Sequence, residues 1–209
     1  GARITFNSPW TAGPGSVIDF SPGGLPSGPP GGRRGHSEID GAPLVSHGTI
    51  HVSGTNSIRA DTTLAEGASV NTDVTGVLDF RGTTTLGDVI FTGLGQATFH
   101  EPLTVTDGHA LFDIGLAFDD TPNMLITSSG ILEQNAPFTM GPGQLVIDEG
   151  GQLRLNNTTN LATGLATIDG LLSLSGNTTM TGGYLGDGRI RFSGNDSTLS
   201  NGASVPVDS

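Results

Sequence analysis

The chain has 209 residues and a formal net charge of −12, and all eight of its cationic residues are arginine. Nucleic acids and anionic membrane surfaces both bind proteins through a basic face, which this composition does not supply. We therefore expect neither nucleic acid nor a membrane surface as a partner. We also expect no membrane insertion, since no window is long and apolar enough to span a bilayer.

The apolar content suits strands better than a large helical core. Hydrophobic residues make up 34% of the chain and aromatic residues 5%, while the chain contains 34 glycines and 12 prolines. Threonine, valine, isoleucine and leucine favour strands, and the frequent Gly, Asn and Asp favour turns between them. The absence of cysteine excludes disulfides and thiolate metal sites. The acidic, weakly charged composition leads us to expect a secreted protein at an extracellular surface, with an export signal removed or as an excised fragment.

Residues 1–45 are rich in proline and glycine, with two short strand-like pieces at Ala2–Phe6 and Ser16–Phe20. This composition predicts an extended N-terminal arm with little core of its own. The arm either is a flexible linker or pairs with a sheet edge of its own or another copy. Its expected inward anchors are the apolar residues of the two pieces: Ile4, Phe6, Val17, Ile18 and Phe20.

The remaining region, 46–209, repeats a five-residue motif. A glycine occupies its first position, and apolar residues occupy its third and fifth positions. Examples are Gly48–Val52, Gly76–Phe80, Gly95–Phe99, Gly108–Phe112, Gly151–Leu155, Gly170–Leu174 and Gly188–Phe192. This alternation is that of a short strand with one face inward, and the glycine indicates a bend without room for a side chain. A polar corner then separates each strand from another inward position.

The repeat spacing favours an all-β, right-handed parallel β-helix, also called a β-solenoid, with coils of roughly 18–22 residues. The starts at 76 and 95 are 19 residues apart, and those at 170 and 188 are 18 apart. Steps of 28 (48 to 76) and 13 (95 to 108) indicate either insertions or starts on a different face. Asn, Ser and Thr at the corners are expected to bond to like residues above and below. An antiparallel sandwich or jelly roll remains the alternative.

Two C-terminal stretches, Gly170–Tyr184 and Gly188–Ala203, resemble the repeats of bacterial autotransporter passenger domains and large exported adhesins. The resemblance extends loosely over residues 48–203. It implies a right-handed parallel β-helix, export and a role at the cell surface. It carries over no functional residues.

Catalytic motifs are present only in fragments. Polygalacturonase-type hydrolases combine Asn-Thr-Asp, Asp-Asp, Gly-His-Gly and Arg-x-Lys; similar pieces here are Asn71–Asp73, Asp119–Asp120, Gly108–His109 and Arg189–Arg191. The histidine precedes the aspartate pair instead of following it, and 46 residues separate Asp73 from Asp119. Two catalytic carboxyls must lie about 5–9 Å apart. We therefore expect no enzyme, no catalytic residue and no cofactor.

Calcium is the one cation that the sequence leaves open. Carboxylates suited to it lie at expected turns: Asp119, Asp120, Asp148, Glu149, Asp187 and Asp196. Carboxylate oxygens are the ligands that calcium prefers, although solvated turn residues are the simpler interpretation. The five histidines show no metal-binding spacing.

Three functions remain open. The first is an extracellular structural protein, a self-assembling subunit of a surface fibre or sheath built by solenoid stacking and by strand donation from the N-terminal arm. Its partner would be itself, as a homopolymer. The second is a fragment of an adhesin or autotransporter passenger that binds a receptor or glycan. The third is a phage tail-spike or carbohydrate-active β-helix, against which the single Trp and single Tyr argue.

Overall fold

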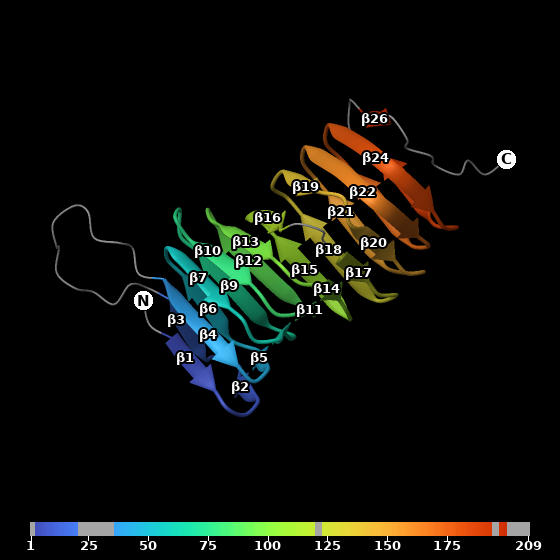
Figure 1. Ribbon diagram of the computed structural model, residues 1–209. Coiled ribbons are helices and arrows are strands. Elements are labelled where there is room, and N and C mark those ends of the chain that lie inside the picture. The colour runs from blue at the N-terminus through green and yellow to red at the C-terminus, as the bar shows by residue number, and fades with distance from the viewer. Residues whose placement is uncertain (1–2, 21–35, 120–122, 194–196, 200–209) are drawn as a thin grey trace.

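The structure is a computed structural model that describes residues 3–20, 36–119, 123–193 and 197–199. All regular elements in these ranges are β-strands, and every pairing between them is parallel. The strands stack into an elongated β-solenoid that runs from the N-terminal to the C-terminal coil (Figure 1). No helix that could cross a membrane occurs in the described ranges.

Each coil contributes one strand to each of three faces. Face 1 contains β1 (Arg3–Phe6), β4 (Ser37–Gly41), β7 (Thr55–Ile58), β10 (Val77–Phe80), β13 (Gln96–Phe99), β16 (Gly115–Phe118), β19 (Phe138–Met140) and β26 (Ser197–Leu199). Face 2 contains β2 (Trp10–Ala12), β5 (Leu44–Ser46), β8 (Thr62–Leu64), β11 (Thr84–Leu86), β14 (Leu103–Val105), β17 (Asn123–Ile126) and β20 (Gln144–Ile147). Two long strands, β22 (Thr159–Ile168) and β24 (Thr178–Leu185), continue from face 1 into face 2.

Face 3 is a separate sheet of nine strands. It contains β3 (Val17–Phe20), β6 (Thr49–Val52), β9 (Ala68–Thr72), β12 (Val89–Gly93), β15 (Gly108–Phe112), β18 (Gly130–Gln134), β21 (Gln152–Leu155), β23 (Leu171–Leu174) and β25 (Arg189–Phe192).

The predicted coil length is confirmed. Ala97 pairs with Leu78, 19 residues before it, and Ile190 pairs with Leu172, 18 before it. Between the later coils the longest step is 22 residues, as from Gly108 to Gly130, whereas the first step, from Ile4 to Ile39, spans 35 residues. The irregular steps arise because the repeated motif starts strands on two faces: it opens β6 and β15 on face 3, but β10 and β13 on face 1.

The N-terminal region differs from the extended arm that its composition suggested. Ile4 pairs in register with Ile39, and Ile18 pairs with Ile50, so residues 3–20 form the first coil of the solenoid. The second coil begins at β4 and β5, before the boundary expected near residue 45. Alternating residues in β1 and β3 are sufficient to extend the ladders of the next coil. The proline- and glycine-rich run 21–35 lies outside the described residues.

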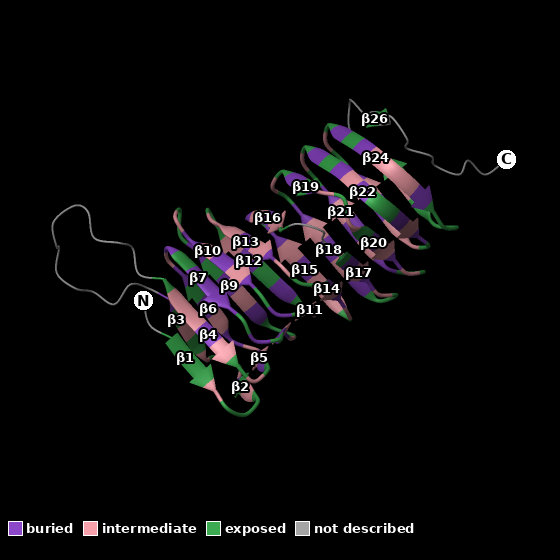
Figure 2. Cartoon of the chain, in the orientation of Figure 1, coloured by how far each residue is buried: buried purple, intermediate pink, exposed green. Residues whose placement is uncertain are grey.

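The core consists of files of side chains that stack from coil to coil, and burial alternates along most strands (Figure 2). In one file, the rings of Phe80 and Phe99 stack with centroids 4.9 Å apart. In the next file, Phe91 and Phe112 stack at 4.1 Å. Parallel in-register pairing places equivalent positions directly above one another, so each file buries like residues on like residues.

Glycine at the strand starts allows the corners to approach closely. A Cβ atom on Gly95 would lie 2.0 Å from the carbonyl oxygen of Gly76, and one on Gly170 would lie 2.2 Å from the Gly151 oxygen. Each contact involves the backbone of the coil before. The bend that the sequence predicted therefore has a steric cause between coils.

A polar ladder runs outside face 3, at the position that follows each strand. Asn135 donates to Asp113 over 2.6 Å, and Asn156 donates to Asn135 over 2.8 Å. Further along, the hydroxyls of Ser175 and Ser193 are 3.0 Å apart. The expected hydrogen bonding between corner residues of successive coils is confirmed here.

Candidate functional site

The two ends of the solenoid are the surfaces where its regular pairing stops. Within the described residues, β1, β2 and β3 each pair with a strand on one side only, and so do β25 and β26. Strand edges of this kind present backbone N–H and C=O groups that another strand can pair with. These two surfaces, the N-terminal end and the C-terminal end, form the candidate assembly site.

At the N-terminal end, inward files finish in partly exposed apolar side chains. Ile4 continues the file of Ile39 but is 52% exposed, because no described coil lies above it. Ile18 is half-buried, and Phe20 is buried. The ring of Phe6 stacks on Trp10 at 4.6 Å with an interplanar angle of 9°. The N-terminal end therefore presents an apolar surface that includes a flat pair of stacked aromatic rings.

Four of the five expected anchors pack against the core or continue an inward file, and Val17 does not. Val17 is 58% exposed and shares the outer side of β3 with Asp19, while Ile18 and Phe20 face the core. The reason is the two-residue period of a strand, which cannot turn adjacent residues to the same face. Val17 therefore belongs to the outer surface of face 3.

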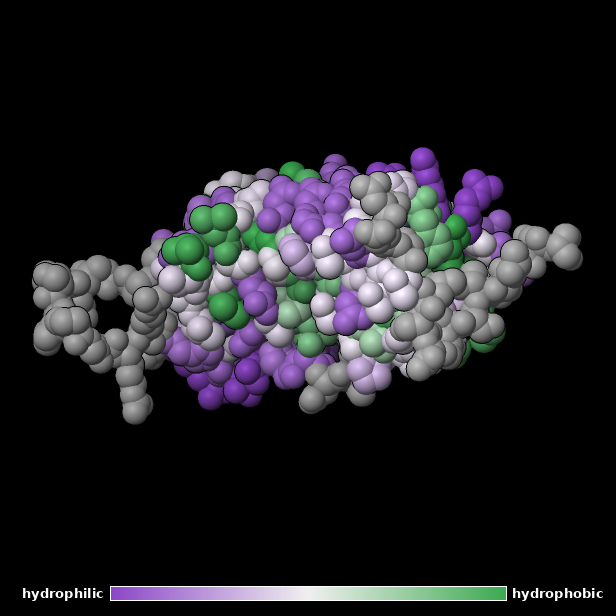
Figure 3. Space-filling model, turned by 90° about the horizontal axis from the view of Figure 1, so that it is seen from above, coloured by the Kyte–Doolittle hydropathy of each residue, from purple (hydrophilic) through white to green (hydrophobic). Residues whose placement is uncertain are grey.

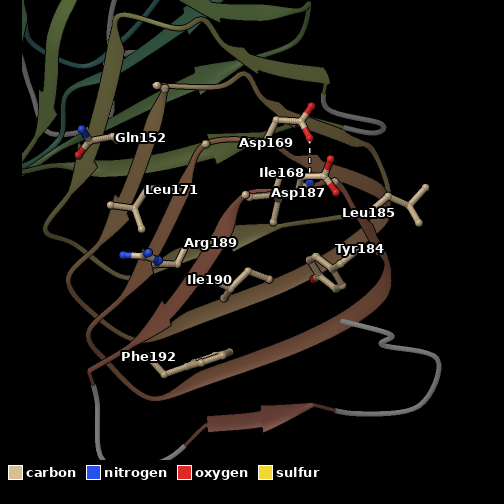
Figure 4. A pocket seen from close by; sticks show the side chains of 15 residues that line it. Gln152, Ile168, Asp169, Leu171, Tyr184, Leu185, Asp187, Arg189, Ile190 and Phe192 are labelled. Carbon is tan, nitrogen blue, oxygen red and sulfur yellow. Dashed lines mark hydrogen bonds between the residues drawn. The ribbon is translucent and has the colours of Figure 1, made fainter. Parts of the chain in front are cut away.

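The C-terminal end is hollowed. A cavity of about 690 Å³ opens there, and Tyr184, Ile190 and Phe192 point into the space enclosed by the last coil (Figure 4). Phe192 ends its file and is 40% exposed, while Tyr184 is buried. Arg189 lies on the outer side of β25 (Figure 4). The hollow is lined by the last members of the apolar files and by polar residues, among them Asp169, Asp187 and Arg189.

The single tyrosine lies in the wall of this hollow with its hydroxyl directed inward. The Tyr184 hydroxyl lies 3.3 Å from the carbonyl oxygens of both Leu161 and Thr181 and can donate to one of them. Burial raises the pKa of Tyr184 above its ordinary value near 10. The ring is therefore neutral at physiological pH and offers an apolar surface to whatever enters the hollow.

The charged side chains of face 1 are paired with one another. Glu38 lies 2.8 Å from the Arg59 Nε and 3.3 Å from the Arg3 Nε, and Arg3 also bonds to Asp40. The hydrogen bond from Arg59 lowers the pKa of Glu38, and the bond from Arg3 lowers that of Asp40. Both carboxyls are charged at neutral pH, and the cations beside them neutralise much of this surface.

The residues similar to a polygalacturonase motif lie at different corners. Asp73 precedes β10, where its carboxylate accepts hydrogen bonds from Ser53 and the Thr75 backbone, both over 2.8 Å. The bond from Ser53 is the main cause of its lowered pKa. Asp119 follows β16 and lies 2.8 Å from His100. The two carboxyls serve separate turns, and Asp120 lies outside the described residues.

Wherever the structure describes them, the acids that the sequence suggested for calcium lie at separate corners, except that Asp148 and Glu149 share one. Over the described ranges, no group of three or more His, Cys, Asp or Glu side chains is placed to hold a metal ion. Asp148, Glu149 and Asp187 lie at turns between face 2 and face 3. The Asp187 backbone N–H donates to the Asp169 carboxylate over 3.1 Å (Figure 4), so this bond links the corners of two successive coils. Asp196 lies outside the described residues.

Outside face 3, the fold assembles a polar network that the sequence did not reveal. Glu133 lies 3.2 Å from His109 and 3.5 Å from Arg154, and it accepts a 2.9 Å bond from Asn156. These residues come from three successive coils and are separated by about twenty residues in the chain. Only the register between strands brings them together. Figure 3 shows that hydrophilic and hydrophobic residues alternate over one long side of the rod.

Comparison with protein-family models, with curated proteins and with solved structures found no match to this chain.

Proposed function

We propose that this protein is an extracellular structural protein whose copies stack end to end into a fibre. One observation carries the proposal: within the described residues, both ends of the solenoid combine unpaired strand edges with apolar files that end in exposed side chains. Parallel coils stack indefinitely unless an end is capped, because each coil offers the next the same ladder. A second copy supplies a matching ladder for β24 and β25, and its β1 takes the place that β26 holds on β24.

The energetics favour stacking that depends on protein concentration. One added coil forms about ten backbone hydrogen bonds along β1, β2 and β3, each worth about 0.5–1.5 kcal/mol. The cost of bringing two molecules together is about 4–15 kcal/mol, which is similar to that gain. Burial of the exposed apolar side chains that end the files, such as Ile4 and Phe192, then decides whether two copies associate.

The contact is stacking of coils and not strand donation by the N-terminal region. Residues 3–20 are already paired with the second coil of their own chain, so they are not available as a free arm. The acidic, weakly charged composition supports the extracellular part of the proposal.

A lysine at Ile4 tests the proposal. Ile4 is half exposed at the N-terminal end, so Ile4→Lys places a charge in the stacking surface at little cost to the fold. Val74→Lys is the matched control, because Val74 is 71% exposed at a corner on the side of the rod. We expect fibres of the unchanged chain and of V74K in negative-stain electron microscopy, and short rods for I4K.

Sedimentation velocity measures the same distribution in solution. Single rods of the unchanged chain at every concentration would contradict the proposal. Equal assembly by I4K and V74K would also contradict it, since the end surface would then have no part in the contact.

An adhesin that binds an anionic glycan is the second candidate. Arg189 and Arg191 project from the exposed outer side of β25, and neither has a carboxylate partner among the described residues, unlike Arg154 nearby. Two guanidinium groups on one strand face suit the carboxylates of an acidic polysaccharide. Calorimetric titration with polygalacturonate at low salt tests this candidate. Binding that the double variant Arg189→Ala, Arg191→Ala abolishes would support it, and the absence of binding would exclude it for this polymer.

A further inference from the structure

One interior file of face 2 begins and ends with an aromatic residue. Trp10 is its first member and pairs with Leu44 of the second coil. The file then continues through successive coils to Ala166, which pairs with Tyr184 in the last coil. The next position of this file lies beyond Tyr184, inside the hollow at the C-terminal end.

We infer that copies of this chain join head to tail, with Trp10 of one copy packed on Tyr184 of the next. This inference rests on the proposed fibre and names the two surfaces that meet in it. Continuing the register of the solenoid by one coil places Trp10 in the next position of the file. β1 of that copy then takes the place on β24 that β26 occupies in a single copy, so β26 leaves β24 when the contact forms. Such a contact between two different surfaces repeats without closing, which produces an open filament.

The two ends present apolar side chains that can pack on one another. The lining of the hollow of about 690 Å³ includes Tyr184, Ile190 and Phe192, together with polar residues at the corner and on the outer side of face 3. The opposite end presents Trp10 stacked on Phe6 as a flat apolar pair. Aromatic rings in contact gain about 0.5–1.5 kcal/mol beyond the burial of their area. The hollow therefore receives apolar side chains, as the core of the solenoid does.

The same register matches face 3. It places Ile18 on Phe192, which continues the apolar file of that face. It also places Asp19 diagonally across from Arg191, within reach of a long side chain. Opposite charges on neighbouring strands favour this orientation of the two copies. A head-to-head contact would make the new ladders antiparallel and would bring two N-terminal ends together, so it would leave the hollow empty.

The fluorescence of these two residues can report on this contact, because Trp10 is the only tryptophan and Tyr184 the only tyrosine. Within one copy the two rings are separated by eight coil steps of about 4.8 Å, or about 38 Å. In the head-to-tail contact they touch. Energy transfer from tyrosine to tryptophan therefore distinguishes a contact between copies from the separation within one copy.

Two conservative variants isolate the transfer between copies. Trp10→Phe retains only the tyrosine, and Tyr184→Phe retains only the tryptophan, so neither variant alone can show transfer. In an equimolar mixed fibre, half of the Tyr184 rings face a Trp10. We expect the tyrosine emission per tyrosine residue to fall to about half of that of assembled W10F alone. Tryptophan emission excited by transfer from tyrosine should appear at the same time.

Electron microscopy of the same samples separates the two proposals. Mixed fibres without energy transfer would overturn the head-to-tail contact and leave the proposed fibre intact. Failure of the unchanged chain to assemble would overturn both. Transfer that persists in dilute samples, where sedimentation shows single rods, would also overturn the contact, because it would then arise without stacking.

Discussion

Replacement of Phe99 by alanine is the most direct test of the stacked core. The Phe99 side chain is buried in the middle of the solenoid, stacked on Phe80 at 4.9 Å and in edge contact with Phe112 at 6.3 Å. Removal of a buried phenylalanine ring costs about 3–5 kcal/mol, and each lost aromatic contact adds about 0.5–1.5 kcal/mol. Because each coil contacts only its neighbours, no distant packing offsets the cavity. We expect Phe99→Ala, which loses two such contacts, to lower the free energy of unfolding by about 4–8 kcal/mol.

Urea unfolding followed by far-ultraviolet circular dichroism measures this loss. Leu94→Ala is the matched control, because Leu94 is 78% exposed in the turn before the same strand. The control should change the free energy by less than about 0.5 kcal/mol. A loss below about 1 kcal/mol for F99A, or equal losses for both variants, would refute the idea that the files carry the stability. A second unfolding transition in F99A would agree with a solenoid weakened at one level.

Three further perturbations test separate features. Gln134 is buried and donates to the carbonyl oxygen of Ile114 over 2.9 Å, so Gln134→Leu leaves that acceptor without a donor; its free energy of unfolding should fall by about 1–3 kcal/mol in urea titrations, and an unchanged value would show that the bond is dispensable. Gly95→Ala forces a Cβ against a backbone oxygen and should lower Tm in calorimetry, whereas Gly13→Ala meets open space and should not; equal effects would contradict the steric argument. The pKa of Glu38 is lowered in the folded state, so the ionised carboxylate stabilises the fold fully above its ordinary pKa near 4.5, and this stabilisation is lost as pH falls below that value. Between about pH 6 and about pH 3 the Tm of Glu38→Gln should therefore fall less than the Tm of the unchanged chain. Parallel curves of Tm against pH would argue against the ion pair.

The repeated motif made most of the fold predictable. A glycine followed by alternating apolar residues specifies a short inward-facing strand, as at Gly170–Leu174, and its recurrence specifies the coil length. The steps of 28 and 13 residues were ambiguous because the motif starts strands on two faces, and a sequence pattern does not label faces. For the same reason the pattern predicts Val17 as an anchor, whereas its neighbour Ile18 occupies the inward position.

The N-terminal region shows how composition can conceal a coil. Its prolines and glycines suggested an extended arm, yet β1, β2 and β3 pair in register with the second coil. Only the eleven residues of these three short strands carry that signal, whereas the sequence 21–35 that follows is rich in turn formers. Ladder hydrogen bonds to an existing coil stabilise short strands that would not be stable alone.

The sequence by itself determined the class of fold, the coil length, the polar corners and the acidic surface, because each follows from local residue types and their period. Only the tertiary structure decided which residues meet between coils. The network around Glu133 and the interior file that runs from Trp10 to Tyr184 both depend on strand register. Register is a relation between distant segments, fixed by packing of the whole stack, and no single repeat contains it.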